Sequence, residues 1–341
     1  MVNFMSDNCS GVHPAIMQTI VDGNEGLVSS YGSDALTQTL ENCFNELFEK
    51  HVGVALLTSG TAANCLAVSL FTPPYGAILC HEEAHMLVDE YGAPGMFTGG
   101  AQMLALPGTH GKIEPHALQA LLSRLASQLV KPTVLSLTQA TECGTIYSLS
   151  ELAELAGIAK QAGLKVHMDG ARFANALATL GCTPAEMTWQ LGINVLSFGG
   201  TKNGCMAAEA VIVFDDDIAL KDELLLRRKK SGHTLSKMRF IAAQFIAYLD
   251  NGLWLENARH ANAMAMRLAH GMTQITKLEP VHRVQANEVF VALPTTHAKL
   301  LLAAGHQFYE WNDGSTRLVT SFATSAHDID IFLHAAQSAV A

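Results

Sequence analysis

Short apolar runs that alternate with helical patterns constrain the fold of this 341-residue chain more than any other feature. They predict buried strands at residues 54–60, 76–80, 102–107, 132–139, 164–170, 193–199 and 209–214. Apolar residues at helical spacing predict helices near 61–71, 114–127, 149–163, 171–180 and 184–190. Strands that alternate with helices favour parallel crossovers. The sequence therefore predicts an α/β fold with a mostly parallel central sheet and helices on both faces.

The C-terminal part of the chain has a different pattern. Residues 234–273 are mainly helical, and strands at 287–293, 306–311 and 317–322 mix with helices near 295–304 and 326–340. A chain of this length suits two domains. We expect a large domain over residues 1–250 and a small α+β domain over 251–341, with the boundary inside the helical stretch 245–270.

Composition narrows the classes of partner. The chain is 49% hydrophobic and 15% charged, which predicts a large core and some surface buried in an oligomer. Its net charge of −10 argues against nucleic acid as a partner, because phosphate binding needs a basic face. Seven scattered cysteines without a Cys-x-x-Cys pair, and no signal peptide or membrane-spanning run, predict a cytoplasmic protein without a membrane partner.

The segment SGTAAN, residues 59–64, follows the first predicted strand and begins a helix. Ser59, Gly60 and Thr61 can offer an anion free backbone N–H groups, hydroxyl donors and the positive end of the helix dipole. Ser and Thr are also common as ordinary helix caps, so this segment alone leaves both interpretations open.

Two further strand ends carry an acid and an amine. Asp169 directly follows the strand at 164–168, where it can cap a helix or pair with a ligand cation. Lys202 stands among glycines in SFGGTKNG, residues 197–204, with Thr201 beside it. A desolvated lysine can act as a nucleophile toward an aldehyde, whereas a solvated surface lysine is the plain alternative. We expect the glycines to provide flexible backbone that brings Lys202 close to a planar ligand.

These three segments should meet at one edge of the sheet, because ligands of open α/β sheets bind beyond the carboxyl ends of the strands. Pyridoxal 5′-phosphate needs a phosphate site, a carboxylate for its pyridine nitrogen and a lysine for its aldehyde. The combination therefore predicts pyridoxal phosphate as the cofactor.

The chain also resembles a known family in five segments that span nearly its whole length: SGTAAN (59–64), HEEAHMLVDE (81–90), HMDGARFANA (167–176), SFGGTKNG (197–204) and RLVTSFATS (317–325). These segments look like the pyridoxal-phosphate-dependent threonine aldolases and β-eliminating lyases of the aspartate-aminotransferase fold type, or fold type I. The resemblance is strongest to the low-specificity L-threonine aldolase or phenylserine aldolase branch. It implies an aldehyde-lyase that cleaves L-β-hydroxy-α-amino acids to glycine and an aldehyde.

The resemblance implies roles for the cofactor site. Lys202 would bind the cofactor covalently, and Asp169 would keep its pyridine nitrogen protonated. Gly60 and Thr61, together with Thr201, would hold the phosphate.

The resemblance also implies the substrate site. His85 would stack on the cofactor ring, and His85 or a water that it positions is the candidate base for the substrate hydroxyl. Arg317 would bind the substrate carboxylate with assistance from Ser6. Arg172 would lie near the ring's phenolic oxygen or the substrate carboxylate.

Tyr31 and Arg228 match family positions that reach into a neighbouring subunit's site. The resemblance thus implies that Tyr31 contacts substrate, that Arg228 contacts cofactor, and that the protein is a homotetramer built as a dimer of dimers. The sequence departs from the family pattern at two places: residues 138–145, TQATECGT, lack the usual histidine, and LVSS, residues 27–30, replaces an acidic run.

Other functions remain open at this point. β-Elimination or transamination would use the same cofactor and fold. A metal-dependent or purely ligand-binding α/β protein is a third alternative, since His81 and His85 are four residues apart. Further ligands at matching spacing are not evident, so we expect no metal.

Overall fold

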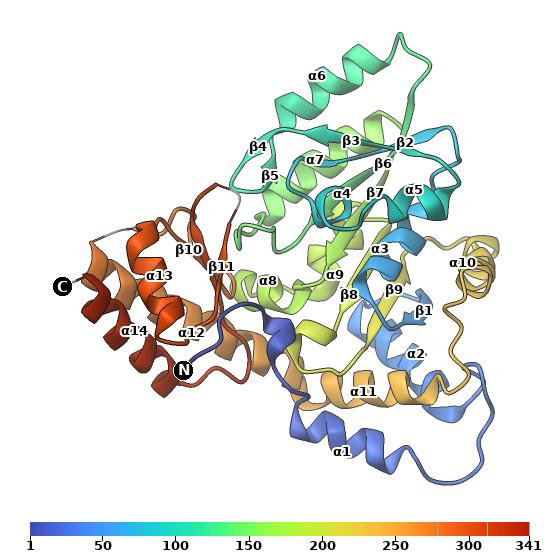
Figure 1. Ribbon diagram of the computed structural model, residues 1–341. Helices are drawn as coiled ribbons and strands as arrows, with labels where there is room; N and C mark the ends of the chain where they lie inside the picture. Colours follow the sequence, from blue (N-terminus) through green and yellow to red (C-terminus); the bar gives the residue numbers. More distant parts are fainter. Residues whose placement is uncertain (278, 312, 341) are drawn as a thin grey trace.

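The computed structural model of the chain describes residues 1–341 except 278, 312 and 341. At its centre lies a seven-stranded sheet (Figure 1). In spatial order its strands are β1 (Gly53–Leu57), β9 (Glu209–Val213), β8 (Val195–Gly199), β7 (Lys165–Gly170), β6 (Lys131–Thr138), β2 (Gly76–His81) and β3 (Gln102–Leu106). Only β9 runs antiparallel to its neighbours within this sheet. The predicted mostly parallel sheet is confirmed.

The strands form around short, mainly apolar runs of the sequence. Every residue of β2 and β8 is buried, which is typical of parallel strands covered on both faces. The helices of this part of the chain are α1 (Pro14–Asp22), α2 (Ala35–Leu47), α3 (Gly60–Ser69), α4 (His85–Val88), α5 (Ala93–Thr98), α6 (Pro115–Leu125), α7 (Leu149–Gln161), α8 (Phe173–Leu180), α9 (Pro184–Met187), α10 (Ile218–Lys230) and α11 (Arg239–Leu249).

Local caps set several of these helix ends. Ser148 and Glu151 form a capping box at the start of α7, and Thr183 and Glu186 form another at the start of α9. The short 3₁₀ helices are η1 (Asp7–Cys9), η2 (Trp189–Leu191), η3 (Thr201–Asn203) and η4 (Asp250–Gly252). The strands β4 (Gly108–Thr109) and β5 (Lys112–Ile113) form a small hairpin. The helix predicted at 184–190 is thus split into α9 and η2.

The C-terminal part forms the smaller lobe at the left of Figure 1. It contains α12 (Leu253–Thr276), α13 (Thr295–Ala303), α14 (Ala326–Val340) and an antiparallel sheet in the order β10 (Glu288–Val291), β12 (Thr316–Val319) and β11 (Tyr309–Glu310). A second apolar core joins these helices and strands, and Val2 and Phe4 of the N-terminal segment belong to it.

The N-terminal segment connects the two parts of the molecule. The backbone N–H of Phe4 donates to the carbonyl of Gln307, and that of Val319 donates to the carbonyl of Phe4. The predicted boundary between residues 250 and 251 falls within η4 and stays a prediction. None of the helices in the described part of the chain is long and apolar enough to cross a membrane.

Candidate functional site

The ends of β6, β7 and β8 bring the candidate residues together. Thr138 at the end of β6 is paired with Asp169, and Asp169 is paired with Ser197 of β8. Lys202 follows β8 directly, in η3. The ends of these strands therefore lie together at one edge of the sheet, as predicted.

Asp169 is buried and held from two sides. Its Oδ2 accepts a hydrogen bond of 2.8 Å from Asn64 Nδ2, and its Oδ1 accepts one of 3.0 Å from the backbone N of Ala171. Asn64 lies on α3 and also donates to Glu90 Oε1 at 3.0 Å. The helix that follows Ser59 is thereby tied to the carboxylate, which fixes the distance between the two predicted cofactor contacts.

Lys202 acts electrostatically on several groups of the site. Together with Arg172 it brings the pKa of Asp7 below its usual value, and it opposes the rise that burial causes in the pKa values of Glu209 and Glu288 and the rise in the pKa of His85. Its amine takes part in none of the hydrogen bonds or ion pairs found among the described residues. This amine is therefore central to the site and available for a ligand.

Glycine is required before and after Lys202 for steric reasons, whereas we predicted that it provides backbone flexibility. A Cβ on Gly199 would lie 2.9 Å from the Cα of Ala171, so a side chain would separate this strand from the loop after Asp169. Gly204 has φ +114°, a conformation that residues with a Cβ rarely adopt. Glycine here allows the close approach of two chain segments, which places Lys202 against the Asp169 loop.

The start of α3 offers an open anion site. Ser59 caps the helix, because its side chain accepts a hydrogen bond from the backbone N of Ala62. A Cβ built on Gly60 would meet nothing within 4 Å, so the space beside the helix end is open. Thr61 is half-buried in the first turn. The helix cap and the anion site are thus compatible interpretations of the same segment.

Thr201 has partners within the protein, while its predicted contact with the phosphate stays a prediction. Its hydroxyl accepts a hydrogen bond of 3.2 Å from the backbone N of Ala208. Glu209 accepts hydrogen bonds from both the hydroxyl and the backbone N–H of Thr201. Burial raises the pKa of Glu209 to about 7, and these hydrogen bonds and Lys202 oppose the rise. Thr201 therefore links Lys202 to a buried acid.

His85 begins α4 rather than continuing a helix from His81, which ends β2. The two histidines do not share the helix face that an i, i+4 metal site would use. The Nδ1 atom of His85 lies 3.1 Å from Glu90 Oε1, and this hydrogen bond raises the pKa of His85. The charge of Asp169 raises that pKa further, while burial and Lys202 oppose the rise.

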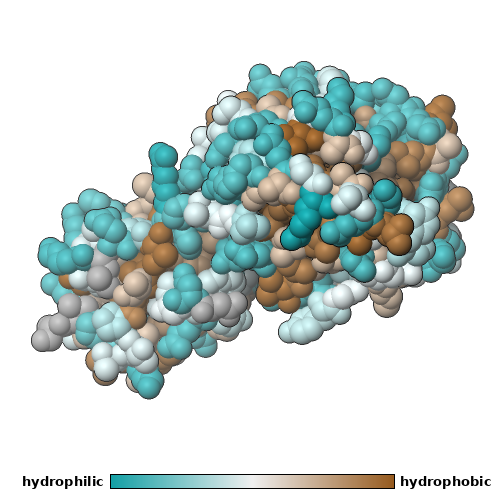
Figure 2. Space-filling model, turned by 90° about the horizontal axis from the view of Figure 1, so that it is seen from above, coloured by the Kyte–Doolittle hydropathy of each residue, from teal (hydrophilic) through white to brown (hydrophobic). Residues whose placement is uncertain are grey.

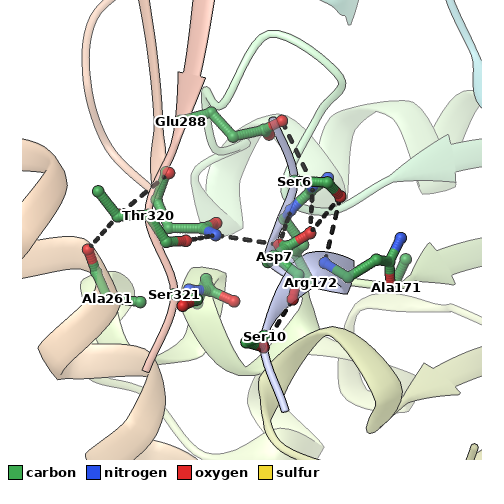
Figure 3. Close-up of polar contacts among 12 residues, drawn as sticks. Ser6, Asp7, Ser10, Ala171, Arg172, Ala261, Glu288, Thr320 and Ser321 are labelled. Atoms are coloured by element: carbon green, nitrogen blue, oxygen red, sulfur yellow. Dashed lines mark hydrogen bonds and ion pairs between the residues drawn. The ribbon is translucent and has the colours of Figure 1, made fainter. Parts of the chain in front are cut away.

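Arg172 is held by two buried acids, as Figure 3 shows. Its Nε and Nη2 atoms donate to the two carboxylate oxygens of Asp7 at 2.7 and 3.0 Å, and Nη2 lies 3.4 Å from Glu288 Oε1. Burial alone would raise the pKa of Asp7, but the charges of Arg172 and Lys202 bring it below its usual value. The Asp7 and Arg172 side chains therefore stay ionised as a fork-shaped pair.

Arg317 approaches the same carboxylate oxygen of Glu288 as Arg172 does. Its Nη1 atom is 3.8 Å from Glu288 Oε1, and Nη2 donates to the carbonyl of Met5 at 3.3 Å. Its guanidinium lies 4.3 Å from the centre of the Trp311 ring. Ser6 follows Met5, caps η1 and donates to Asp7 Oδ1 at 3.3 Å. The structure thus brings Ser6, Arg172 and Arg317 together.

Tyr31 and Arg228 line a separate cavity of about 200 Å³, together with Glu41 and residues of α2, β1 and α10. Arg228 is buried there, and burial lowers its pKa while Glu41 opposes the fall. Tyr31 is exposed, and Lys229 Nζ lies 4.9 Å from the centre of its ring. Within one chain, this cavity does not include Lys202 or Asp169.

Sequence reasoning missed several acids of the site: Asp7, Glu142, Glu209 and Glu288. Glu142 lies in the segment that lacks the usual histidine, and its Oε1 atom accepts a hydrogen bond of 2.8 Å from the backbone N of His85. Glu142 could have been found from its position near the end of the strand predicted at 132–139. Asp7 and Glu288 are brought to Arg172 from distant parts of the chain, for which the sequence offers no periodic signal.

The residues present fit pyridoxal phosphate. A buried carboxylate, an amine without a hydrogen-bond partner among the described residues, and an open helix N-terminus stand at the ends of β7, β8 and β1, which lie at the same edge of the sheet. Asp169 would face the cofactor's ring nitrogen, Lys202 its aldehyde and the start of α3 its phosphate.

Comparisons with known proteins agree with this chemistry. The family model described as beta-eliminating lyase matches residues 3–295. The chain is 39% identical, over 323 residues, to the low specificity L-threonine aldolases of Pseudomonas aeruginosa and of a Pseudomonas species; each alignment covers 94% of this chain and 93% of the relative.

Solved structures of related proteins also resemble this chain. The threonine aldolase of Leishmania major superposes with a TM-score of 0.93 and 27% identity, over 100% of both chains. The serine palmitoyltransferase of Sphingomonas wittichii matches with a TM-score of 0.74 and 14% identity, covering 99% of this chain and 86% of the other. The latter likeness shows the fold alone.

Proposed function

The chain belongs to the beta-eliminating lyase family, and on this premise we propose that it is an aldehyde-lyase for L-β-hydroxy-α-amino acids. Its substrates are of the threonine, allo-threonine and phenylserine type, and its products are glycine and an aldehyde. The observation that carries the proposal is the meeting of Lys202, Asp169 and the start of α3 beside Arg172 and Arg317, whose side chains are 10% and 14% exposed. An amino acid offers the carboxylate that such arginines bind.

Pyridoxal phosphate is the cofactor that the family and its structural relatives indicate. When bound, it supplies an electron-withdrawing ring that stabilises negative charge at the substrate Cα. Lys202 binds its aldehyde, Asp169 holds its ring nitrogen, and His85 contacts its ring. Ser59, Gly60, Thr61 and Thr201 hold the phosphate, with Arg228 supplied by a neighbouring subunit.

Arg317 orients the substrate by its carboxylate, assisted by Ser6 and Arg172. The planar guanidinium of Arg317 rests on Trp311, which fixes its orientation before substrate arrives. Arg172 is already neutralised by Asp7, so Arg317 provides the stronger attraction for a new anion.

The test of this function is a panel of β-hydroxy amino acids, including both threonine diastereomers and phenylserine. Glycine and the matching aldehyde should appear in equal amounts. Pyruvate and ammonia without glycine would instead indicate β-elimination, and transfer of the amino group to an oxo acid would indicate transamination. Either result without glycine would overturn the proposal.

Arg317→Ala is expected to raise KM by about 30-fold or more, since losing one partner of a buried charge pair costs about 2 kcal/mol or more. The effect on kcat should be smaller, because the carboxylate is bound in both the ground and transition states. The matched control is Arg267→Ala, which removes an exposed arginine that pairs with Asp330. Arg317→Lys should be intermediate, and an unchanged KM in Arg317→Ala would contradict the carboxylate role.

We further propose that the protein is a cytoplasmic homotetramer, a dimer of dimers, in which Tyr31 and Arg228 complete a neighbour's site. Their place in a cavity apart from Lys202 supports this sharing. A groove of about 740 Å³, lined by Met96, Phe97 and Leu226 among others, offers apolar surface for contact between chains. Hydrophobic residues also gather on the face of the larger lobe seen in Figure 2.

The mass of the protein in solution, measured by light scattering, should be four times that of one 36.5 kDa chain. A monomer with full activity would contradict shared sites.

The free state of all seven cysteines supports a reducing compartment, as expected for a cytoplasmic protein.

A further inference from the structure

Glu142 has a carboxylate oxygen without a hydrogen-bond partner in the described part of the chain, on the side of the candidate site where His85 lies. The Oε1 atom of Glu142 accepts two hydrogen bonds, 2.9 Å from Thr138 Oγ1 and 2.8 Å from the backbone N of His85. Its Oε2 atom is buried and has no hydrogen-bond partner among the described residues. Burying an acceptor without a donor is unfavourable, so such an atom calls for an explanation.

Glu142 lies among the residues of the candidate site. Its charge contributes to the raised pKa of Arg172, and the charge of Asp169 acts on Glu142 in turn. Its charge also adds to the raised pKa values of Cys80, Cys143 and Tyr147, and the backbone N of His85 donates to it. Burial raises the pKa of Glu142 to about 7, with Asp169 adding to the rise and the two hydrogen bonds opposing it. Both protonation states are therefore accessible near neutral pH.

His85 is less suited to accept a proton. Its Nδ1 atom is engaged by Glu90, and that hydrogen bond and Asp169 favour the protonated ring. A protonated imidazole carries N–H donors at both nitrogens and offers no acceptor. A separate acceptor beside His85 would leave the histidine free to contact the ring.

We infer that Glu142 is the catalytic base that accepts the β-hydroxyl proton of the substrate at its Oε2 atom. This inference rests on the proposed function. The hydroxyl O–H bond breaks, and its proton passes to Oε2. The oxygen then forms the C=O bond of the departing aldehyde, while the electron pair of the Cα–Cβ bond stays with Cα. A proton then adds to Cα to give glycine, and Glu142 releases its proton to solvent, so no net proton is gained or lost.

The variant Glu142→Gln distinguishes the role of Glu142 as a base from a purely structural role. In Glu142→Gln, the amide oxygen still accepts from Thr138 and from the backbone of His85, but the second atom becomes an NH₂ donor. We expect cleavage of phenylserine to fall on the order of 10²-fold or more, the usual effect of removing a general base. Glu154→Gln, an exposed change on α7, is the matched control.

Exchange of the α-proton of glycine with solvent deuterium provides the second measurement on the same protein. Glycine has no β-hydroxyl group, so Glu142→Gln should exchange it at the wild-type rate. The wild-type kcat/KM for cleavage should rise as pH increases through about 7, when Glu142 loses its proton. Thr138→Val removes a hydrogen bond that lowers this pKa, so the rise should move to higher pH.

Infrared spectra of the cofactor-free chain give a measurement independent of activity. A protonated-carboxyl band should disappear as pH is raised through about 7, and the part due to Glu142 should be missing in Glu142→Gln. Burial also raises the pKa of Glu209 to about 7, so the Glu142 signal is obtained by subtracting the spectrum of Glu142→Gln from that of the wild-type protein.

The outcomes separate the two proposals. Normal cleavage in Glu142→Gln, or an equal loss of cleavage and glycine exchange, would overturn the role of Glu142 as base while leaving the lyase function in place. Absence of glycine release by the wild-type protein with every substrate would overturn the function itself.

Discussion

Lys202→Ala is expected to lose covalent cofactor binding and to release glycine on the order of 10³-fold more slowly or worse, since the nucleophilic amine is removed. The reason lies in its surroundings: Lys202 acts on Asp7, Glu209 and Glu288, and its amine is uncommitted among the described residues. The rate of glycine release at saturating cofactor and the visible absorption of the protein measure the two losses.

Lys160→Ala, which removes an exposed lysine in the last turn of α7, is the control for Lys202→Ala. It should keep both the rate and the absorption. Lys202→Ala also removes an amine that acts electrostatically on buried acids, so melting curves should accompany the kinetics. A folded Lys202→Ala protein with more than a tenth of wild-type activity would contradict the assignment.

Asp169→Asn is the second substitution with a large expected effect. Asparagine has nearly the same shape and can keep the hydrogen bond from Ala171, but it lacks the charge that favours a protonated ring nitrogen. We expect a loss in rate on the order of 10²-fold or more, as for other preorganised electrostatic groups, together with weaker cofactor binding. Fluorescence titration with cofactor and steady-state rates measure the two effects.

The control for Asp169→Asn is Asp215→Asn, which weakens a peripheral ion pair with Lys165. Such pairs contribute about 0–1 kcal/mol, so rate and cofactor affinity should stay at wild-type values. Equal cofactor affinity and equal rate in Asp169→Asn would show that the carboxylate does not face the ring nitrogen.

The central sheet is predictable from the sequence because most of its strands have a short, mainly apolar run at their centre. β2 and β8 are buried throughout, and the helices between strands carry clear apolar spacing and caps. The predicted fold type I and the resemblance to threonine aldolases and β-eliminating lyases are confirmed by the relatives and by the Leishmania major structure.

The strand-end rule finds Asp169 and Lys202 because Asp169 lies at the end of β7 and Lys202 comes just after β8, and the parallel order of β6, β7 and β8 places them at one edge. The reason for the neighbouring glycines could not be found this way. Gly199 is required by the close approach of Ala171, a contact between loops that local sequence does not encode.

The acids around Arg172 were missed for a similar reason. Asp7 is 165 residues from Arg172 in sequence, and Asn287, which donates to Asp7 at 3.0 Å, is 280 residues from Asp7. Such pairs depend on how the N-terminal segment and β10 come to lie against the large sheet. Single-sequence patterns report local periodicity and strand ends, and they do not report which distant polar residues become partners.

The most direct test of the cofactor site is a peptide map of the wild-type protein after borohydride reduction in the presence of pyridoxal phosphate. Reduction makes the bond between the lysine and the cofactor permanent, so mass spectrometry can identify the residue that carries it. We predict a single modified peptide, with the added mass on Lys202. Modification of another lysine, with Lys202 unmodified, would contradict the proposed site.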